Sequence, residues 1–421
     1  MKILIANYRY FISGGPERYM FNLTDQLLAK GHEVIPFSIH YAKNVSTPFS
    51  RYFVEPLGNR DQVYFDQQKK SFKTVSRTLS RLFYSPEVEK AVCRIVADHK
   101  PRVAYILHYL RKLSPALLVG LKKRNIPIIV RLSDYGMLCP QAHFLRDNQP
   151  CTLCAHGKIL PSVQYRCIKA SLAASALNMM ATWYHRQRHF FDLIDCFVCT
   201  NNFMYTMMLD AGYPESKLTC IPTFNNIEHF SPTDGYSKSD YIAYCGRIAE
   251  LKGVHVLLEA MAHLKKKNCA DLRLKIAGTG DPKYIDACRR QIAGMRLETN
   301  VEFVGELNTE QLPEFLANAL FSVVPSLSFE NLPNSLIESL ACGTPVIASN
   351  IGSLKGCIEN GRNGFLFNPG DSLDLADKIA TCLGNETFLN AMAINARLEA
   401  EAEYSPGNHI NKLMKVFNEL L

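Results

Sequence analysis

The sequence predicts two α/β domains, each built on a doubly wound parallel sheet, because its length, its apolar content and the order of its strands agree. The 421 residues exceed one ordinary hydrophobic core and suggest two domains of about 200 residues each. Hydrophobic residues make up 47%, which is enough to fill two cores. Short apolar strands alternate with helical stretches, and this pattern begins again at Tyr241.

The expected strands of the first half are buried apolar runs. They cover residues 3–6, 34–38, 103–107, 128–132 and 196–199. We assign 1–222 to the first domain and 223–400 to the second, because Ile221 to Asp240 is rich in Pro, Asn, Ser and Gly and suits a hinge above a cleft. The remaining segment, 401–421, contains an amphipathic helix from His409 to Leu421 that could cross back to the first domain.

Two glutamates eight positions apart, Glu330 and Glu338, follow an apolar run, Ala319 to Pro325, that predicts a buried strand. Pro333 fits the first turn of a helix that carries Ser335 to Leu340. Glu330 then projects from the strand-to-helix loop and Glu338 from the helix. A carboxylate at the second position can accept both vicinal hydroxyls of a ribose, while the first meets the hydroxyls of a sugar. The alternative is that both are ordinary solvated acids.

Two cations stand at another strand-to-helix junction. Arg247 and Lys252 lie in the run from Gly246 to Gly253, between the expected strand 241–245 and the expected helix 254–264. A guanidinium and an ammonium fixed there form a clamp for a diphosphate, although isolated cations are more often solvated surface charges.

These segments are similar to the retaining glycosyltransferases of family 4, which have the GT-B fold of two Rossmann-like domains facing a cleft. The resemblance covers nearly the whole chain and is most specific in the second half. It rests on Lys2-Ile3-Leu4-Ile5-Ala6, Gly14-Gly15-Pro16-Glu17-Arg18, Thr200-Asn201-Asn202, Ile221-Pro222, Phe230-Ser231-Pro232, the Arg247/Lys252 pair, Leu274 to Gly280, Val304-Gly305, the Glu330/Glu338 pair and Gly361 to Leu366.

The resemblance implies a role for each matched residue. Arg247 and Lys252 would neutralise the diphosphate leaving group, which would be the main catalytic effect, with Glu330 and Asp134 as further catalytic candidates. The sugar would be retained in configuration by front-face transfer, so we name no nucleophile. No metal is needed for transfer, because no Asp-x-Asp pair ends a strand. The implied donor-binding residues are Gly14, Gly15, Gly246, Glu330, Asn331, Leu332, Pro333, Glu338, Gly352 and Ser353.

Three positions depart from the family pattern. Many relatives have His before Asp after the strand that matches 128–132, where this chain has Ser133 and Asp134. Asp134 or Ser133 could take the polar role, or His108 could reach in from the preceding strand. The usual glycine pair is Gly352-Ser353, and Gly356 replaces a glutamate. The donor class is therefore better defined than the donor.

Charge divides unevenly along the chain. Residues 1–200 hold 28 Lys and Arg against 13 Asp and Glu, whereas the rest hold 19 against 26. The basic first half predicts an anionic partner, although no module for nucleic acid accompanies the charge. The densest patch is Lys69 to Phe83, whose apolar stripe suits an anionic membrane or, equally, packing on the core. A second apolar stretch, Lys169 to Trp183, is expected to be a core helix, with a lipid- or acceptor-facing role as the alternative; the basic segment Tyr184 to His189 follows it.

Four of the fourteen cysteines lie close together in a loop-like region, 139–167. Cys139, Cys151, Cys154 and Cys167 can supply four thiolates to a structural zinc, with His143 and His156 as substitute ligands. The alternatives are four unliganded thiols or a redox pair. A closed site would order a loop that contacts the acceptor.

The expected function is transfer of a sugar from a nucleotide-diphosphate donor, first of all a UDP-sugar, to a glycan or polyprenyl-linked glycan in bacterial surface polysaccharide or capsule synthesis. No stretch is long and apolar enough for a membrane span, and the chain begins with a strand. We therefore expect a cytoplasmic protein, peripheral to the inner face of the membrane. The alternatives are a sugar-nucleotide epimerase or a sugar phosphorylase of the same fold, or a non-catalytic component that binds sugar nucleotides.

Overall fold

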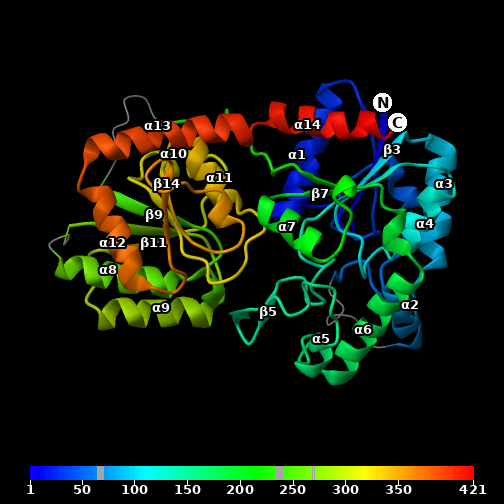
Figure 1. Cartoon of the computed structure of the whole chain (residues 1–421), viewed down its shortest axis with the longest axis horizontal. Helices are drawn as coiled ribbons and strands as arrows, with labels where there is room; N and C mark the ends of the chain where they lie inside the picture. The colour runs from blue at the N-terminus through cyan, green and yellow to red at the C-terminus, as the bar shows by residue number, and fades with distance from the viewer. Residues whose placement is uncertain (64–70, 233–239, 268, 270) are drawn as a thin grey trace. The chain divides into compact units, whose positions relative to one another are not determined.

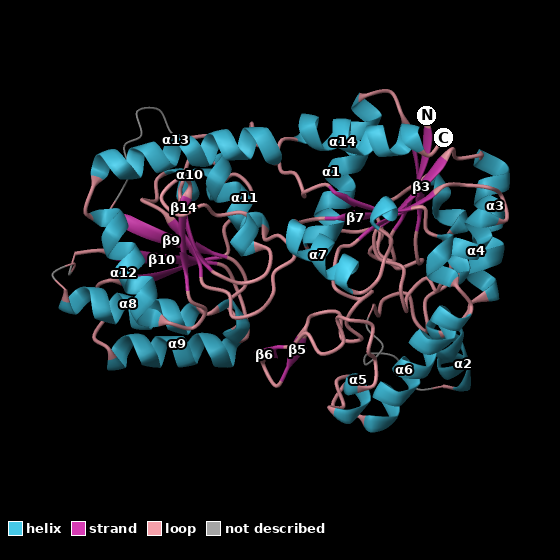
Figure 2. Ribbon diagram, in the orientation of Figure 1, coloured by secondary structure: helices cyan, strands magenta, loops and turns pink. Residues whose placement is uncertain are grey.

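The computed structural model describes residues 1–63, 71–232, 240–267, 269 and 271–421. The chain divides into two compact units. The first unit contains Met1–Arg146, Cys151–Ile221 and Ile410–Leu421, and the second contains Asp147–Pro150 and Pro222–His409. Each unit has one six-stranded sheet with helices on both of its faces (Figures 1 and 2).

The first sheet is parallel throughout and has the strand order β2-β1-β3-β4-β7-β8. Its strands are β1 Lys2–Ala6, β2 Glu33–Phe37, β3 Val103–Ile106, β4 Ile128–Arg131, β7 Cys196–Cys199 and β8 Leu218–Cys220. Its α-helices are α1 Gly15–Ala29, α2 Phe72–Leu82, α3 Pro86–His99, α4 Ala116–Lys122, α5 Pro161–Gln164, α6 Leu172–Gln187 and α7 Asn202–Asp210. A short pair, β5 Leu145–Arg146 and β6 Gln149–Pro150, lies apart from this sheet.

The second sheet is also parallel and has the order β11-β10-β9-β12-β13-β14. Its strands are β9 Tyr241–Cys245, β10 Arg273–Ala277, β11 Val301–Gly305, β12 Ser322–Val324, β13 Val346–Ser349 and β14 Gly364–Phe367. Its α-helices are α8 Val254–Lys266, α9 Pro282–Gly294, α10 Gln311–Ala317, α11 Asn334–Ala341, α12 Ser372–Leu383 and α13 Glu386–Glu403.

Two hydrophobic cores, one on each face, hold the second sheet. Successive residues of β9 enter different cores: Ile242 and Tyr244 join the core under α8, α9 and α12, whereas Tyr241 and Ala243 join the core under α10 and α11. This alternation follows from the two-residue period of a strand. Burial of both faces explains why the strands are continuous apolar runs, and it confirms the predicted doubly wound architecture.

The last helix, α14 Pro406–Glu419, begins three residues earlier than expected. Its residues from Ile410 onward belong to the first unit. There the Phe417 ring lies 5.9 Å from that of Tyr105, and Lys30 Nζ donates to Asn411 Oδ1 at 3.3 Å.

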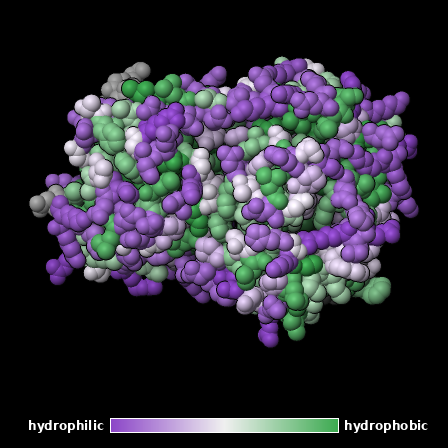
Figure 3. Space-filling model, in the orientation of Figure 1, coloured by the Kyte–Doolittle hydropathy of each residue, from purple (hydrophilic) through white to green (hydrophobic). Residues whose placement is uncertain are grey.

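The prediction of a core helix at 169–183 was wrong. Ser171 caps α6, since its Oγ accepts a hydrogen bond from Ala174 N, but the helix buries only Ser175, Asn178, Ala181 and His185. Leu172, Met180 and Trp183 are exposed instead. Figure 3 shows hydrophobic residues gathered over α5 and α6 at this end of the molecule. The apolar run therefore does not mark a core element.

The basic patch at 69–83 lies only partly within the description, because Lys69 and Lys70 are outside the described residues. From Phe72 onward it forms α2, which buries Thr74 and Arg81 and exposes Phe72, Val75 and Leu79. The alternative in which the stripe packs on the core is therefore wrong for these three residues. Among the described helices, none combines the length and apolar content needed to cross a bilayer.

Candidate active site

In the second unit, the residues predicted to bind phosphate and sugar lie in loops that follow the carboxyl ends of two neighbouring strands. Gly246 and Arg247 follow β9, and a single 3-10 turn, Glu250–Lys252, leads into α8. The loop that follows β12 carries Glu330. Since β9 and β12 are adjacent in the sheet, the two loops come together at one edge, which is where open α/β sheets bind ligands.

The close approach of these loops depends on glycine. Gly253 has a φ of 71°, and a Cβ at this position would lie 1.9 Å from the carbonyl oxygen of Pro325. Leu327 N also donates a hydrogen bond to Leu251 O at 2.9 Å. A side chain at Gly253 would separate the Lys252 turn from the glutamate loop.

Lys252 and Glu330 form an ion pair, with 2.5 Å between Nζ and Oε1. Ser326 Oγ donates to the same carboxylate oxygen at 2.7 Å, and Ser353 Oγ donates to the Glu330 carbonyl oxygen at 2.7 Å. Only 13% of the Glu330 side chain is exposed. Three predicted residues, Lys252, Glu330 and Ser353, are thus brought together. The side chain of Arg247, which precedes Lys252 in the same loop, is exposed.

Glu338 lies in the second turn of α11 and is only 4% exposed. Its Oε1 accepts a hydrogen bond from Asn225 Nδ2 at 3.1 Å, so the carboxylate is held in place. Pro333 is the residue before this helix, with extended backbone, and is not in its first turn as expected. Asn331 and Leu332 complete the half-buried loop between β12 and α11.

Gly352 and Ser353 form a turn behind the glutamate loop. Gly352 has a φ of 55°, and a Cβ there would lie 2.9 Å from Phe329 Cδ1. The element that follows is a single 3-10 turn, Leu354–Gly356. The serine that replaces the second glycine of the family pattern is 1% exposed and holds the backbone of Glu330.

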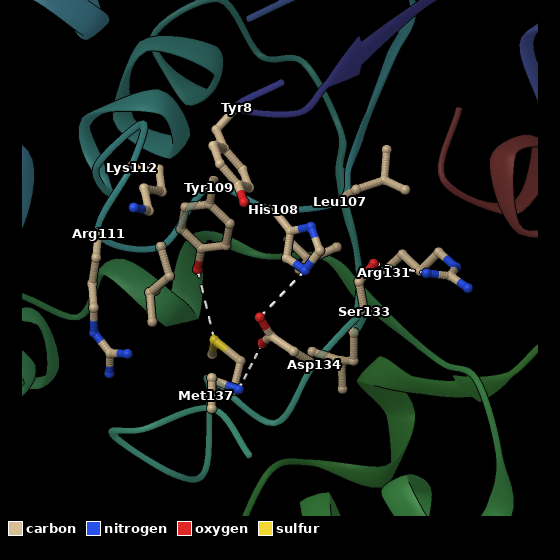
Figure 4. A pocket seen from close by; sticks show the side chains of 15 residues that line it. Tyr8, Leu107, His108, Tyr109, Arg111, Lys112, Arg131, Ser133, Asp134 and Met137 are labelled. Carbon is tan, nitrogen blue, oxygen red and sulfur yellow. Dashed lines mark hydrogen bonds and ion pairs between the residues drawn. The ribbon is translucent and has the colours of Figure 1, made fainter. Parts of the chain in front are cut away.

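The first unit has a pocket of about 200 Å³ at the carboxyl ends of β1, β3 and β4 (Figure 4). Polar side chains from the three following loops line it: Tyr8, His108, Tyr109, Arg111, Lys112, Ser133 and Asp134. Arg111 Nη1 donates to Pro140 O at 2.7 Å and fixes one wall. With Arg131 from the end of β4, the pocket therefore combines one carboxylate with an imidazole and three cationic side chains.

His108 and Asp134 contact each other in this pocket, with 3.3 Å between Nε2 and Oδ2. Gly136 N donates to the other carboxylate oxygen at 2.7 Å. Burial acts against ionisation, but His108, the Gly136 N–H and Arg111 together hold the pKa of Asp134 below its ordinary value. The carboxylate is therefore ionised at neutral pH, and 41% of its side chain is exposed for contact with a ligand.

Ser133 is engaged elsewhere. Its Oγ accepts a hydrogen bond from Arg131 Nη1 at 2.7 Å, and the buried Arg131 guanidinium lies 3.9 Å from the centre of the Tyr19 ring. Of the three residues that the sequence left open, His108 and Asp134 thus act as a pair, while Ser133 supports a buried cation.

The Gly14-Gly15 turn begins α1, with Gly14 as the preceding residue in extended conformation. Ser13 links two charges beside it: Arg9 Nη1 donates to Ser13 Oγ at 2.7 Å, and Ser13 Oγ donates to Glu17 Oε2 at 3.0 Å. Glu17 is buried in the first turn, where its charge suits the positive end of the helix dipole. Both glycines are exposed, which leaves their N–H groups accessible.

Several contacts in the two sites were missed by the sequence reasoning. Asn225, Ser326, Tyr8 and Lys112 were not singled out. Tyr8 and Lys112 could have been found, because they follow two expected parallel strands whose carboxyl ends share one edge. Asn225 and Glu338 are 113 positions apart in the sequence, so no local sequence pattern predicts their contact.

The four clustered cysteines all lie in the first unit. Burial and the neighbouring thiols of Cys139, Cys167 and Cys151 raise the pKa of Cys154 to about 12. Three thiols therefore lie close enough to act on the Cys154 sulfur, and sulfur is a donor atom that zinc prefers. Throughout the described ranges, however, no three His, Cys, Asp or Glu side chains are arranged to hold a metal ion. The zinc site stays a prediction.

Comparison with known proteins finds a family model that matches part of the chain. Residues 225–399 match the family model described as glycosyl transferases group 1. A phosphatidyl-myo-inositol mannosyltransferase of Mycobacterium leprae is 29% identical over 203 residues, which are 47% of this chain and 52% of the relative. The chain spans about half the length of the curated relatives that it matches first.

Solved structures match the whole chain in fold. Sucrose-phosphate synthase from Thermosynechococcus elongatus has a TM-score of 0.71 at 19% identity, and the match covers 100% of this chain and 98% of that one. The Anabaena protein HepE, in complex with UDP-glucose, has a TM-score of 0.66 at 17% identity, with 100% of both chains covered. These likenesses confirm the GT-B fold.

Proposed function

We propose that the chain is a retaining glycosyltransferase, because residues 225–399 match the family model of group 1 glycosyl transferases. It takes a sugar from a nucleotide diphosphate and passes it to a glycan or polyprenyl-linked glycan. The observation that carries this proposal is the cluster of Lys252, Glu330 and Ser353 at the carboxyl edge of β9 and β12. A cation beside a fixed carboxylate suits the binding of a sugar diphosphate, which supports the proposal.

The reaction breaks the bond between the anomeric carbon and the diphosphate oxygen, which leaves with the electron pair. The acceptor hydroxyl forms the new bond on the same face and gives its proton to a departing phosphate oxygen. Charge grows on the diphosphate, so Lys252 and the exposed Arg247 stabilise the transition state more than the ground state. Lys252 has three donors, which allows it to serve Glu330 and a phosphate together.

The other predicted residues hold the donor. Glu338 is fixed by Asn225 and keeps acceptor capacity for the ribose hydroxyls. Glu330 and the loop through Pro333 receive the sugar. In the first unit, Asp134 accepts hydroxyl hydrogens of the transferred sugar or acceptor, because its lowered pKa keeps it ionised. His108 orients this carboxylate through the 3.3 Å contact.

UDP is the first nucleotide to test, since HepE, a protein of the same fold, binds UDP-glucose. The basic first half of the chain favours an anionic acceptor such as a polyprenyl-diphosphate-linked glycan. We place the reaction at the cytoplasmic face of a bacterial membrane, in surface polysaccharide or capsule synthesis.

A donor panel tests the proposal. The protein is incubated with UDP-, GDP-, dTDP- and ADP-sugars and with short glycan acceptors, and both nucleotide release and product configuration are measured. One donor should release its nucleotide in an acceptor-dependent manner and give a product with retained configuration. Isomerised donor would indicate an epimerase, phosphate-dependent release a phosphorylase, and binding without turnover a non-catalytic component.

We also propose a structural zinc on Cys139, Cys151, Cys154 and Cys167, supported by the thiols gathered around Cys154. Bound metal would order the 139–167 loop and take no part in transfer. Elemental analysis of the purified protein should find about one zinc per chain, lost in Cys154→Ser. If the purified protein contains no zinc and still binds nucleotide with full affinity, the proposed zinc site is wrong.

A further inference from the structure

One end of the first unit exposes apolar side chains from α5 and α6 and their connecting segments. Leu160, Leu172, Met180 and Trp183 are exposed by 56%, 55%, 48% and 58%. Between the two helices lies a groove of about 570 Å³ lined mainly by apolar residues: Ile159, Leu160, Pro161, Met179, Met180 and Trp183. We call the four exposed residues and the lining of this groove together the α5–α6 surface. It lies at the bottom of Figure 3.

The helix α2 adds three more exposed apolar residues, Phe72, Val75 and Leu79, which lie on one face at helical spacing. Its C-terminal end is joined to that of α6. His185 Nε2–H donates to Phe83 O at 3.0 Å, and the rings of Phe83 and Tyr184 lie 5.9 Å apart at 62°. The two helices are therefore joined at their C-terminal ends.

The two chain segments that carry these exposed faces have charged residues of one sign. Residues 148–191 contain five Lys and Arg and no Asp or Glu, and residues 71–84 contain three Lys and Arg and no Asp or Glu. Lys158, Arg166 and Arg188 are exposed. Isolated apolar residues are common on any protein, but an apolar group flanked by exposed cations is complementary to an anionic interface.

Two occupants have the required apolar character, another protein or a membrane. A protein partner would have to supply acids for at least five exposed cations, whereas an anionic bilayer supplies negative charge at its surface and apolar volume below it. The chain's single tryptophan lies in this surface, and tryptophan favours the depth at which lipid headgroups meet acyl chains. These features favour the bilayer.

We propose that the α5–α6 surface, with the exposed face of α2, docks the first unit on a bilayer that contains anionic phospholipid. The inference rests on the proposed function only for its setting, since a polyprenyl-linked acceptor lies in such a bilayer. The apolar residues enter the headgroup region, and the surrounding cations contact lipid phosphates.

The single tryptophan makes a direct test available. The fluorescence of Trp183 is recorded while vesicles of phosphatidylcholine, with or without phosphatidylglycerol, are added in the absence of nucleotide and acceptor. With phosphatidylglycerol we expect a shift to shorter wavelength, quenching by brominated acyl chains, and sedimentation of the protein with the vesicles. High salt should weaken binding. An unchanged Trp183 spectrum would overturn the proposal and point to a protein partner.

Matched variants locate the contact. Leu160→Ser/Met180→Ser should weaken vesicle binding about tenfold or more, because two apolar side chains no longer leave water. Ile394→Ser/Leu398→Ser changes two residues of similar exposure on α13 and should bind as the parent does. Equal binding by both double variants would contradict the docking surface. Donor turnover is measured separately on both, so a failure of the transferase proposal remains distinguishable from a failure of docking.

Discussion

The two units of the molecule turn their backbones in different ways. Among the described residues of the second unit, positive φ occurs at eight glycines and at three other residues, Asp147, Asn148 and Arg296. Among those of the first unit, it occurs at three glycines and at ten residues with side chains. Glycine adopts this conformation without steric cost, whereas other residues need surrounding contacts to hold them there. The turns of the second unit are therefore marked by glycine in the local sequence, whereas many turns of the first unit depend on tertiary packing.

This difference explains which site could be predicted. The Lys252 and Glu330 loops of the second unit are marked by glycines and by strands on both sides, so their meeting can be anticipated from spacing. In the first unit, two residues that line the pocket, Arg111 and Ala142, have left-handed conformation, and the residue types at these positions do not predict it. Four experiments can break or sharpen the comparison.

The largest expected effect is on turnover in the second unit. Arg247→Ala should lower kcat by about a hundredfold to a thousandfold, since a preorganised cation for the leaving group is lost. The melting temperature should stay unchanged, because the Arg247 side chain is exposed. Arg290→Ala, on the exposed face of α9, is the matched control and should keep full activity. Near-normal turnover in Arg247→Ala would remove this residue from the diphosphate clamp.

Backbone substitutions compare the units directly. Gly253→Ala should lower the free energy of unfolding by about 3 kcal/mol, because its Cβ would overlap Pro325 O and its φ is unfavourable. Ala142→Gly, at a φ of 67° in the first unit, should change it by less than about 1 kcal/mol. Denaturant unfolding of both variants measures the contrast. Equal changes in the free energy of unfolding would show that the two kinds of turn do not differ in their contribution to stability.

The pocket of the first unit predicts a smaller loss of activity. Asp134→Asn should reduce kcat by about a hundredfold, because a charged acceptor of hydroxyl hydrogens becomes neutral. Ser133→Ala should keep most activity, since the Ser133 hydroxyl, although it lines the pocket, is already bonded to Arg131. Steady-state kinetics with the preferred donor measures both. A greater loss in Ser133→Ala would reverse the assignment.

The smallest expected effect concerns acid stability of the first unit. Burial lowers the pKa of His185 from 6.5 to about 4, so the folded protein resists a proton that the unfolded chain accepts. Stability is therefore lost as pH falls below 6.5, by about 2 kcal/mol at pH 5. His185→Gln should weaken this dependence, whereas His189→Gln, an exposed residue nearby, should preserve it. Identical pH profiles for both variants would refute the linkage.

Much of the fold could be predicted, and the limits have physical causes. The strands at 196–199 and 241–245 were predicted at their observed bounds, because burial on both faces gives a continuous apolar run. The helix at 172–187 was misjudged as core for the same reason: an apolar run does not say whether anything covers it. The His108 and Asp134 contact required the order of strands, since β3 and β4 are neighbours only in the folded sheet.

The most direct test of the donor site is thermal shift with nucleotides. UDP, GDP, dTDP, ADP and CMP are added to the parent protein and to Glu338→Ala. We predict that one diphosphate, UDP first, raises the parent's melting temperature, because a ligand at about a hundred times its Kd adds about 2.7 kcal/mol to the native state. The shift should vanish in Glu338→Ala. No shift with any nucleotide, or an equal shift in the variant, would contradict a donor site built on Glu338.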